Sequence, residues 1–269
     1  MQERLTIVRP PDLGQELASA VSAACATPVR ITPDDIPLIT ARLACGDFET
    51  VRKLLHDAPA GPALPLALAR YVRWTGDLRT AVASWSRIRD AVATLPEHDA
   101  GLQWTTYSEL ALTATDVGDA QLAARLHRLA RSLPVAPATV TSQTAARLIH
   151  HVALDLIGLD PDAARGRLRL RPRTDRFAML HARHIRFGDA SLSLCAERDE
   201  GGLLIRLEQE SGSIPVTVLL EAVVAAGNRA EVDGRPADLM LRPVEGGNLF
   251  PVQFVLDHER SLRVRTATP

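Results

Sequence analysis

The spacing of apolar residues changes about half way along the chain. Between residues 12 and 157, Leu, Ala, Val and Ile recur at steps of three and four, which is the period of an amphipathic helix. After Pro161 the pattern becomes short alternating runs, such as RLRLR at 167–171, and this is the period of a strand with one buried face. The sequence therefore predicts a helical domain at residues 1–157 and an all-β domain at residues 158–269.

The dipeptide Gly-Asp marks three corners in the helical half. Gly46-Asp47, Gly76-Asp77 and Gly118-Asp119 each follow one apolar helical pattern and precede another. Glycine can adopt the left-handed conformation that ends a helix, and aspartate can accept the free amide hydrogens that begin the next one. Each corner therefore predicts a helical hairpin, and the uneven spacing favours a ring of hairpins with variable loops over an array of fixed period.

Glycine also separates the alternating runs of the second half. Gly201-Gly202, Asp233-Gly234 and Gly246-Gly247 lie between them and provide the positive φ angles that tight antiparallel turns need. We therefore expect an antiparallel β-sandwich, and the fold class is α+β with more than one domain.

Composition narrows the choice of partners. The chain has 269 residues, is 46% hydrophobic, and carries 31 basic against 32 acidic residues for a formal net charge of −1. A chain of this length can bury a substantial core, and its overall charge creates no field that would gather nucleic acid or an anionic membrane. We expect neither partner.

The cysteines and the apolar segments indicate a cytoplasmic protein. Cys25, Cys45 and Cys195 are widely spaced without a C-x-x-C pair, which suits reduced thiols better than disulfides or a zinc site. No run reaches the roughly 20 apolar residues of a membrane span, and the prolines of MQERLTIVRPP interrupt any signal-peptide core. The sequence itself assigns no role to residues 1–32.

Four segments resemble one family of carbohydrate enzymes. They are LPLALARYVRWTGDLRTAVASW at 64–85, ELALTATDVGDAQLAARLHRLARSL at 109–133, TSQTAARLIHHVALDLIGLDPDAARGRLRLRPR at 141–173 and IRFGDASLSLCAER at 185–198. They are similar to the C-terminal part of bacterial amylo-α-1,6-glucosidase or glycogen-debranching proteins, which are six-hairpin relatives of glucoamylase. The resemblance implies an incomplete (α/α)6 toroid of helical hairpins followed by the β-sandwich.

The chain departs from this family where catalysis would lie. The family places an acidic, Gly- and Trp-rich segment after the helix that follows W-T-G-D, whereas here that helix ends at Leu95 and PEHDAGLQW leads directly into the next one. Inverting glycoside hydrolysis needs two carboxyl groups about 6.5–9.5 Å apart. The deletion therefore implies a degenerate hydrolase without catalysis, and if any activity remains it would be that of an α-glucosidase.

Four carboxylates are the candidates for residual chemistry. Glu97 and Asp99 flank His98 near the deleted segment and either supply an acid and a base or lie in a solvated loop. Glu109 is a further candidate on the following helix. Asp35, beside Asp34, either binds a substrate hydroxyl or caps the helix that begins near Ile36.

Aromatic side chains are the candidates for sugar binding. Trp74, with Trp85 eleven residues later, either stacks on pyranose rings or braces the corner of a hairpin. Trp104 and Tyr107 lie three residues apart on one helical face, which either lines the mouth of the ring or packs in the core.

Two classes of function follow from these observations. The first is a carbohydrate-related protein that binds α-glucan or a smaller sugar. The alternative is a non-catalytic scaffold whose helical hairpins bind another protein, and a second copy or a protein partner would then cover the open side of the ring. The neighbours His150 and His151 diverge by about 100 degrees on a helix, and neither a metal site nor a cofactor motif is predicted.

Overall fold

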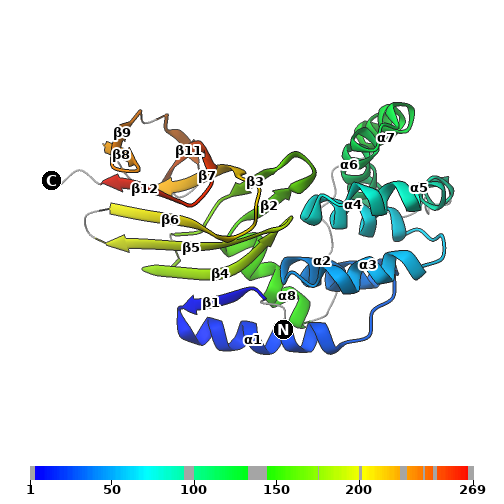
Figure 1. Ribbon diagram of the computed structural model, residues 1–269, viewed down its shortest axis with the longest axis horizontal. Coiled ribbons are helices and arrows are strands. Elements are labelled where there is room, and N and C mark those ends of the chain that lie inside the picture. Colours follow the sequence, from blue (N-terminus) through cyan, green and yellow to red (C-terminus); the bar gives the residue numbers. More distant parts are fainter. Residues whose placement is uncertain are drawn as a thin grey trace.

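The computed structural model describes residues 4–93, 100–132, 144–174, 176–199, 202–224, 229–238, 240–244 and 247–265. It is an α+β combination in which helices α2 to α7 gather at one end of the molecule and two sheets occupy the other (Figure 1). The α-helices are α1 (Pro11–Ala26), α2 (Ile36–Ala44), α3 (Phe48–Asp57), α4 (Leu64–Thr75), α5 (Leu78–Ala93), α6 (Ala100–Asp116), α7 (Ala120–Ser132) and α8 (Thr144–His150). Shorter helical segments are η1 (Pro33–Asp35), the π-helix η2 (His151–Leu156) that continues α8, and η3 (Ala163–Arg165).

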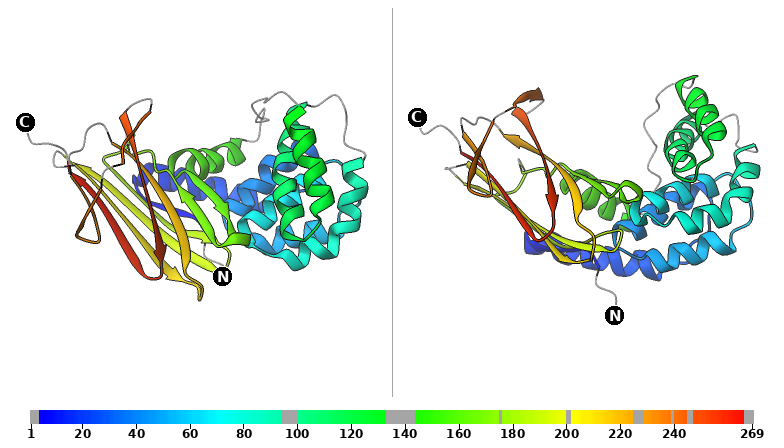
Figure 2. Two further views of the ribbon diagram at one scale, coloured as in Figure 1. Left: turned by 90° about the horizontal axis from the view of Figure 1, so that it is seen from above. Right: turned by 45° about the horizontal axis from the view of Figure 1, so that its top comes forward.

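The helices form two layers. Helices α8, α2, α4 and α6 contact one another in that order and make the inner layer, while α3, α5 and α7 lie against them as the outer layer. Figure 2 shows the hairpins α2–α3, α4–α5 and α6–α7 at the end away from the sheets, with α8 between them and the strands. The pairing follows from the sequence, because α2, α4 and α6 are each joined to the next outer helix by a short corner.

The Gly-Asp corners have the predicted backbone. Gly46, Gly76 and Gly118 all have positive φ angles, of 80°, 70° and 83°. Two of the three aspartates cap the next helix as expected: Asp77 Oδ1 accepts the Thr80 amide at 3.1 Å, and Asp119 Oδ1 accepts the Leu122 amide at 3.1 Å.

The third aspartate has another role. The Asp47 carboxylate accepts the Thr50 hydroxyl at 2.7 Å and pairs with the buried Arg42 guanidinium at 3.1 Å. Arg42 also donates to the carbonyls of Cys25 and Thr27 at the end of α1. A buried guanidinium needs a counter-charge, and Asp47 provides it in place of an amide cap.

The strands of the described residues form two sheets that face each other (Figure 2). The seven-stranded sheet has the order β1-β4-β5-β6-β12-β8-β9, and the five-stranded sheet has the order β10-β11-β7-β3-β2. The strands are β1 (Thr6–Arg9), β2 (Leu159–Asp162), β3 (Arg167–Leu170), β4 (Met179–Phe187), β5 (Ala190–Asp199), β6 (Gly202–Ser211), β7 (Val216–Val224), β8 (Arg229–Val232), β9 (Arg235–Ala237), β10 (Arg242–Val244), β11 (Gly247–Leu256) and β12 (Glu259–Arg265).

One strand pair corrects the expectation of a purely antiparallel sandwich. Strand β3 runs parallel to β7, with Arg167 opposite Thr217 and Leu170 opposite Leu220. Parallel neighbours need a long crossover, and strands β4, β5 and β6 of the other sheet provide it. The predicted turn at Asp233-Gly234 is confirmed. These two residues have φ angles of 51° and 73° and form the two-residue connection between β8 and β9.

The N-terminal segment contributes a strand that the periodicity did not predict. Strand β1 pairs with β4, with Thr6 opposite Arg183 and Ile7 opposite Ala182. Helix α1 then packs directly on this strand, because a Cβ on Gly14 would lie 2.2 Å from the Ile7 carbonyl oxygen. The first part of the chain is thereby tied to the β half.

The last turn of α4 joins the helices to the sheets. The Trp74 carbonyl accepts the Gly188 amide of the β4–β5 turn at 2.9 Å, and Arg73 Nε donates to the Pro161 carbonyl at 3.2 Å. Next to this contact, Arg165 pairs with Asp116 of α6 at 2.8 Å. These contacts place the helical layers against β2 and η3, and we call them the α4 junction.

We expect Gly158→Ala to destabilise the protein much more than Gly118→Ala. Both glycines have positive φ angles, so alanine costs about 1–2 kcal/mol of backbone strain at either position. A Cβ on Gly158 would also lie 2.3 Å from the Arg171 carbonyl oxygen, whereas nothing lies within 4 Å of one on Gly118. Overpacking adds about 1–3 kcal/mol at Gly158 alone. Urea unfolding of both variants measures the difference, and equal losses would contradict the close approach.

Candidate functional site

The tryptophans that the sequence offers for sugar stacking hold helices together. Trp74 is 3% exposed and packs in the core at the α4 junction, as the bracing interpretation expects. The Trp85 indole donates to Asp119 Oδ2 at 2.8 Å, which links α5 to the corner between α6 and α7. Neither ring forms an open platform.

The other sequence candidates are placed as follows. Tyr107 on α6 is 8% exposed, and burial raises the pKa of its phenol. The Asp35 carboxylate accepts the Thr32 hydroxyl at 2.7 Å and makes no side-chain cap to α2. Glu97, Asp99 and the side chain of Trp104 lie outside the described residues.

Glu109 belongs to a polar cluster on the inner helices. Its carboxylate pairs with Arg70 of α4 at 3.3 Å, and the two side chains are 16% and 18% exposed. Arg70 Nη1 donates to the Thr40 hydroxyl of α2 at 2.6 Å, and that hydroxyl donates in turn to the Ile36 carbonyl. Three successive inner helices are thus connected by one guanidinium.

His150 extends this cluster to the fourth inner helix. Its Nε2 lies 2.9 Å from the Pro37 carbonyl oxygen, so this nitrogen carries the proton that it donates. Burial lowers the pKa of His150, and the positive charge of Arg70 lowers it further. We call Thr40, Arg70, Glu109 and His150 the inner polar cluster.

The chemistry of the inner polar cluster is limited by its charges. It contains one carboxylate, and that carboxylate is neutralised by Arg70. Hydrolysis by inversion uses a protonated and an ionised carboxyl group on opposite sides of a sugar. The cluster as described therefore offers hydrogen-bonding groups, but it offers no acid–base pair.

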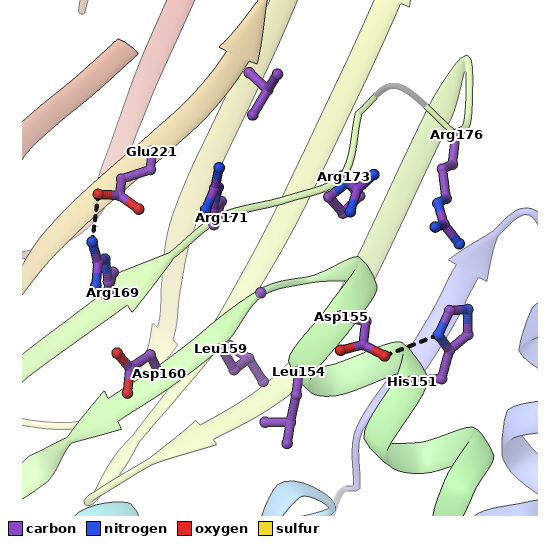
Figure 3. A pocket seen from close by; sticks show the side chains of 12 residues that line it. His151, Leu154, Asp155, Leu159, Asp160, Arg169, Arg171, Arg173, Arg176 and Glu221 are labelled. Atoms are coloured by element: carbon purple, nitrogen blue, oxygen red, sulfur yellow. Dashed lines mark hydrogen bonds and ion pairs between the residues drawn. The ribbon is translucent and has the colours of Figure 1, made fainter. Parts of the chain in front are cut away.

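A second polar site lies between the π-helix and the five-stranded sheet. It is a hollow of about 800 Å³ among η2, β2, the continuation of β3, and β7 (Figure 3). Four arginines share it, and we call it the arginine pocket. Its lining residues are His151, Leu154, Asp155, Gly158, Leu159, Asp160, Arg169, Arg171, Arg173, Arg176, Glu221 and Val223.

The carboxylates of the arginine pocket have partners. Glu221, whose side chain is 7% exposed, pairs with Arg169 at 2.8 Å. Asp155 lies 3.2 Å from His151 Nδ1, and Asp160 pairs with Arg73 of the α4 junction. Sequence reasoning did not select these arginines, because the run RLRLRPR was interpreted only as strand periodicity.

Metal and thiol chemistry have little support among the residues that the structure describes. Within them, no group of three His, Cys, Asp or Glu side chains could hold a metal ion. The three cysteines are free. Burial raises the pKa of the Cys45 thiol and raises that of Cys195 to about 11, which suppresses the reactive thiolate.

Across the described ranges no helix is long and apolar enough to cross a membrane.

A solved structure is weakly similar to this chain. No family model matches the chain, and no curated protein matches it. Among solved structures, it is similar to Ara127N-Se, a GH127 β-L-arabinofuranosidase from Geobacillus stearothermophilus T6, with a TM-score of 0.30 and 12% identity. The similarity covers 79% of this chain and 33% of that enzyme, so the chain spans about a third of its length.

We expect Arg70→Met to raise the pKa of His150 toward its ordinary value, because the substitution removes a positive charge that disfavours the imidazolium. Arg70→Lys is the control, since it keeps the charge. NMR titration of the imidazole C–H resonances measures the shift. An unchanged pKa in Arg70→Met would contradict the coupling.

The same pKa shift sets a pH dependence of stability. Because the folded pKa of His150 is lowered, its contribution to stability is present above the unfolded pKa of about 6.5 and is lost as the pH falls toward the folded pKa. The loss should be smaller in Arg70→Met, and unfolding free energies measured across this range test it.

Proposed function

We propose that this chain is a non-hydrolytic descendant of a debranching-type glycoside hydrolase and that it binds α-glucan or a related sugar. The observation that carries the proposal is the ion pair between Arg70 and Glu109 on the inner helices. An enzyme of this class would need a second carboxylate facing this one. Here an arginine occupies the opposing helix instead.

The arrangement of helices supports the proposed ancestry. The inner helices α2, α4 and α6 follow one another in chain order with outer helices behind them, as expected for part of an (α/α)6 toroid, and α8 lies against α2 at the other end of the row. Within the described residues, the four debranching-like segments fall on α4 to α8, on the α4 junction and on strands β2 to β5. The proposal therefore treats the helical layers as an arc of the toroid.

Sugar binding is assigned to the inner polar cluster. A carboxylate and a guanidinium that remain 16% and 18% exposed can accept from and donate to neighbouring sugar hydroxyls. Because Trp74 and Tyr107 are buried, this binding would rest on hydrogen bonds more than on ring stacking, and weak affinity follows.

We expect no release of glucose from branched dextrin, and we expect heat on titration with maltoheptaose. Glu109→Gln removes the charge that strengthens hydrogen bonds to hydroxyls, so binding should weaken by about five-fold. The exposed Glu259 on β12 provides the control variant Glu259→Gln. Glucose release that disappears in Glu109→Gln would show catalysis, and an absence of heat would remove sugar from the proposal.

A protein-binding scaffold is the second candidate function. Helix α6 is the last member of the inner row, and Leu112 on it is 37% exposed. Val82 on the outer helix α5 is 60% exposed. Apolar side chains at the end of a helical arc suit a contact with a second copy of the chain or with another protein.

We expect the chain to form a homodimer through this end of the arc. Leu112→Glu would then give a monomer, because it places a charge in an apolar contact. Val255→Glu is the control, since Val255 is 50% exposed but lies on β11 in the β half. Size-exclusion chromatography with light scattering measures the masses, and a monomeric unsubstituted protein would exclude the dimer.

A further inference from the structure

Arginine occupies every second position along β3 and its continuation. Side chains at 168, 170, 172 and 174 are buried, whereas Arg167, Arg169 and Arg171 are exposed and Arg173 is partly so. Successive residues of an extended chain point to opposite faces, so the four arginines share one face. The Cα atoms of successive arginines on that face are about 6.5–7 Å apart, because an extended chain rises about 3.3 Å per residue.

A row of like charges on one strand face is unfavourable in itself. Like charges repel when their side chains are neighbours in a sheet. The buried residues of this strand do not require arginine at the exposed positions between them, because any polar residue would suit those positions. Of this row, Arg169, Arg171 and Arg173 line the pocket, and Arg176 adds a fourth arginine to it. Such a departure from local preference is expected where a function compensates for it.

The acidic groups of the pocket do not neutralise the whole row. Glu221 pairs with Arg169, and Asp160 pairs with Arg73, which lies outside the lining. Asp155 is bound to His151 and its side chain is 70% exposed, so its charge is screened by solvent. Among the described residues, the side chains of Arg171 and Arg176 form no ion pair.

Backbone contacts hold the arginines in place. The Arg171 amide donates to the Gly158 carbonyl at 3.1 Å, and the Arg173 amide donates to the Leu156 carbonyl at 2.8 Å. The strand is thus fixed against the end of η2. Figure 3 shows Arg169, Arg171, Arg173 and Arg176 in a row on one side of the hollow, with Asp160, Leu159, Leu154 and His151 on the other side.

We propose that the arginine pocket binds a small phosphorylated ligand. A planar guanidinium matches the oxygens of a phosphate group and binds two of them at once, and Arg171 and Arg176 provide this charge without an ion pair to any carboxylate of the described residues. A hollow of about 800 Å³ holds more than a phosphate ion, and Leu154 and Leu159 offer an apolar wall to an organic group. The inference is independent of glucan binding at the inner polar cluster.

The test is calorimetric titration with inorganic phosphate, pyrophosphate, glucose 6-phosphate and unphosphorylated glucose at low ionic strength. We expect at least one phosphorylated probe to bind, and we expect the double variant Arg171→Gln/Arg176→Gln to raise its Kd about ten-fold or more, since each hydrogen bond to a charged group contributes substantially. Arg263→Gln is the matched control, because Arg263 is an exposed strand arginine on β12 outside the pocket. Thermal unfolding verifies that all variants fold.

Each outcome decides the inference. Tighter binding of glucose 6-phosphate than of phosphate supports an organic ligand, whereas equal binding supports a free phosphate or pyrophosphate in the same site. Absence of binding, equal binding of glucose, or an equal loss in Arg263→Gln would overturn the pocket as a phosphate site. Binding confined to a long polyanion such as heparin would also overturn it.

Discussion

The α4 junction is the constraint on which the rest of the structure depends. One helix end contacts a turn between two strands, the Pro161 carbonyl and, through neighbouring residues, the Arg165–Asp116 ion pair. The residues that make these contacts lie in four separate stretches of the sequence, which are RWTGD, ATDVGD, LDPDAARG and IRFGD. Contacts between stretches so far apart in the chain fix how the helices and the sheets are joined.

Much of the fold could be predicted because its signals are local. A positive φ angle at Gly76 and an aspartate that caps the next helix depend on a few neighbouring residues, as does the Asp233-Gly234 turn. The missed features depend on more distant parts of the chain. Strand β1 pairs with a strand that follows some 170 residues later. Asp47 pairs with Arg42 because the end of α1, at Cys25 and Thr27, buries that guanidinium.

The candidate site was harder to predict, since the identity of a residue does not reveal what it contacts. Glu109 is a plausible catalytic acid in the sequence, but in the fold it faces Arg70. Trp74 resembles a stacking residue and lies in the core. The arginine pocket was missed for the opposite reason: a net charge of −1 averages over the surface and conceals a local excess of positive charge.

Strand β3 shows why fold and function can be separated in this chain. Leu168, Leu170 and the buried residues after them satisfy the core, and the parallel pairing with β7 needs only their backbone and this inner face. On the outer face, Arg169 neutralises the buried Glu221, whereas Arg171 makes no ion pair among the described residues. Arginines repeated on that face therefore add repulsion that the buried side of the strand does not require. A ligand with the opposite charge would remove this repulsion, which is why the pocket is best understood as a site completed by an anion.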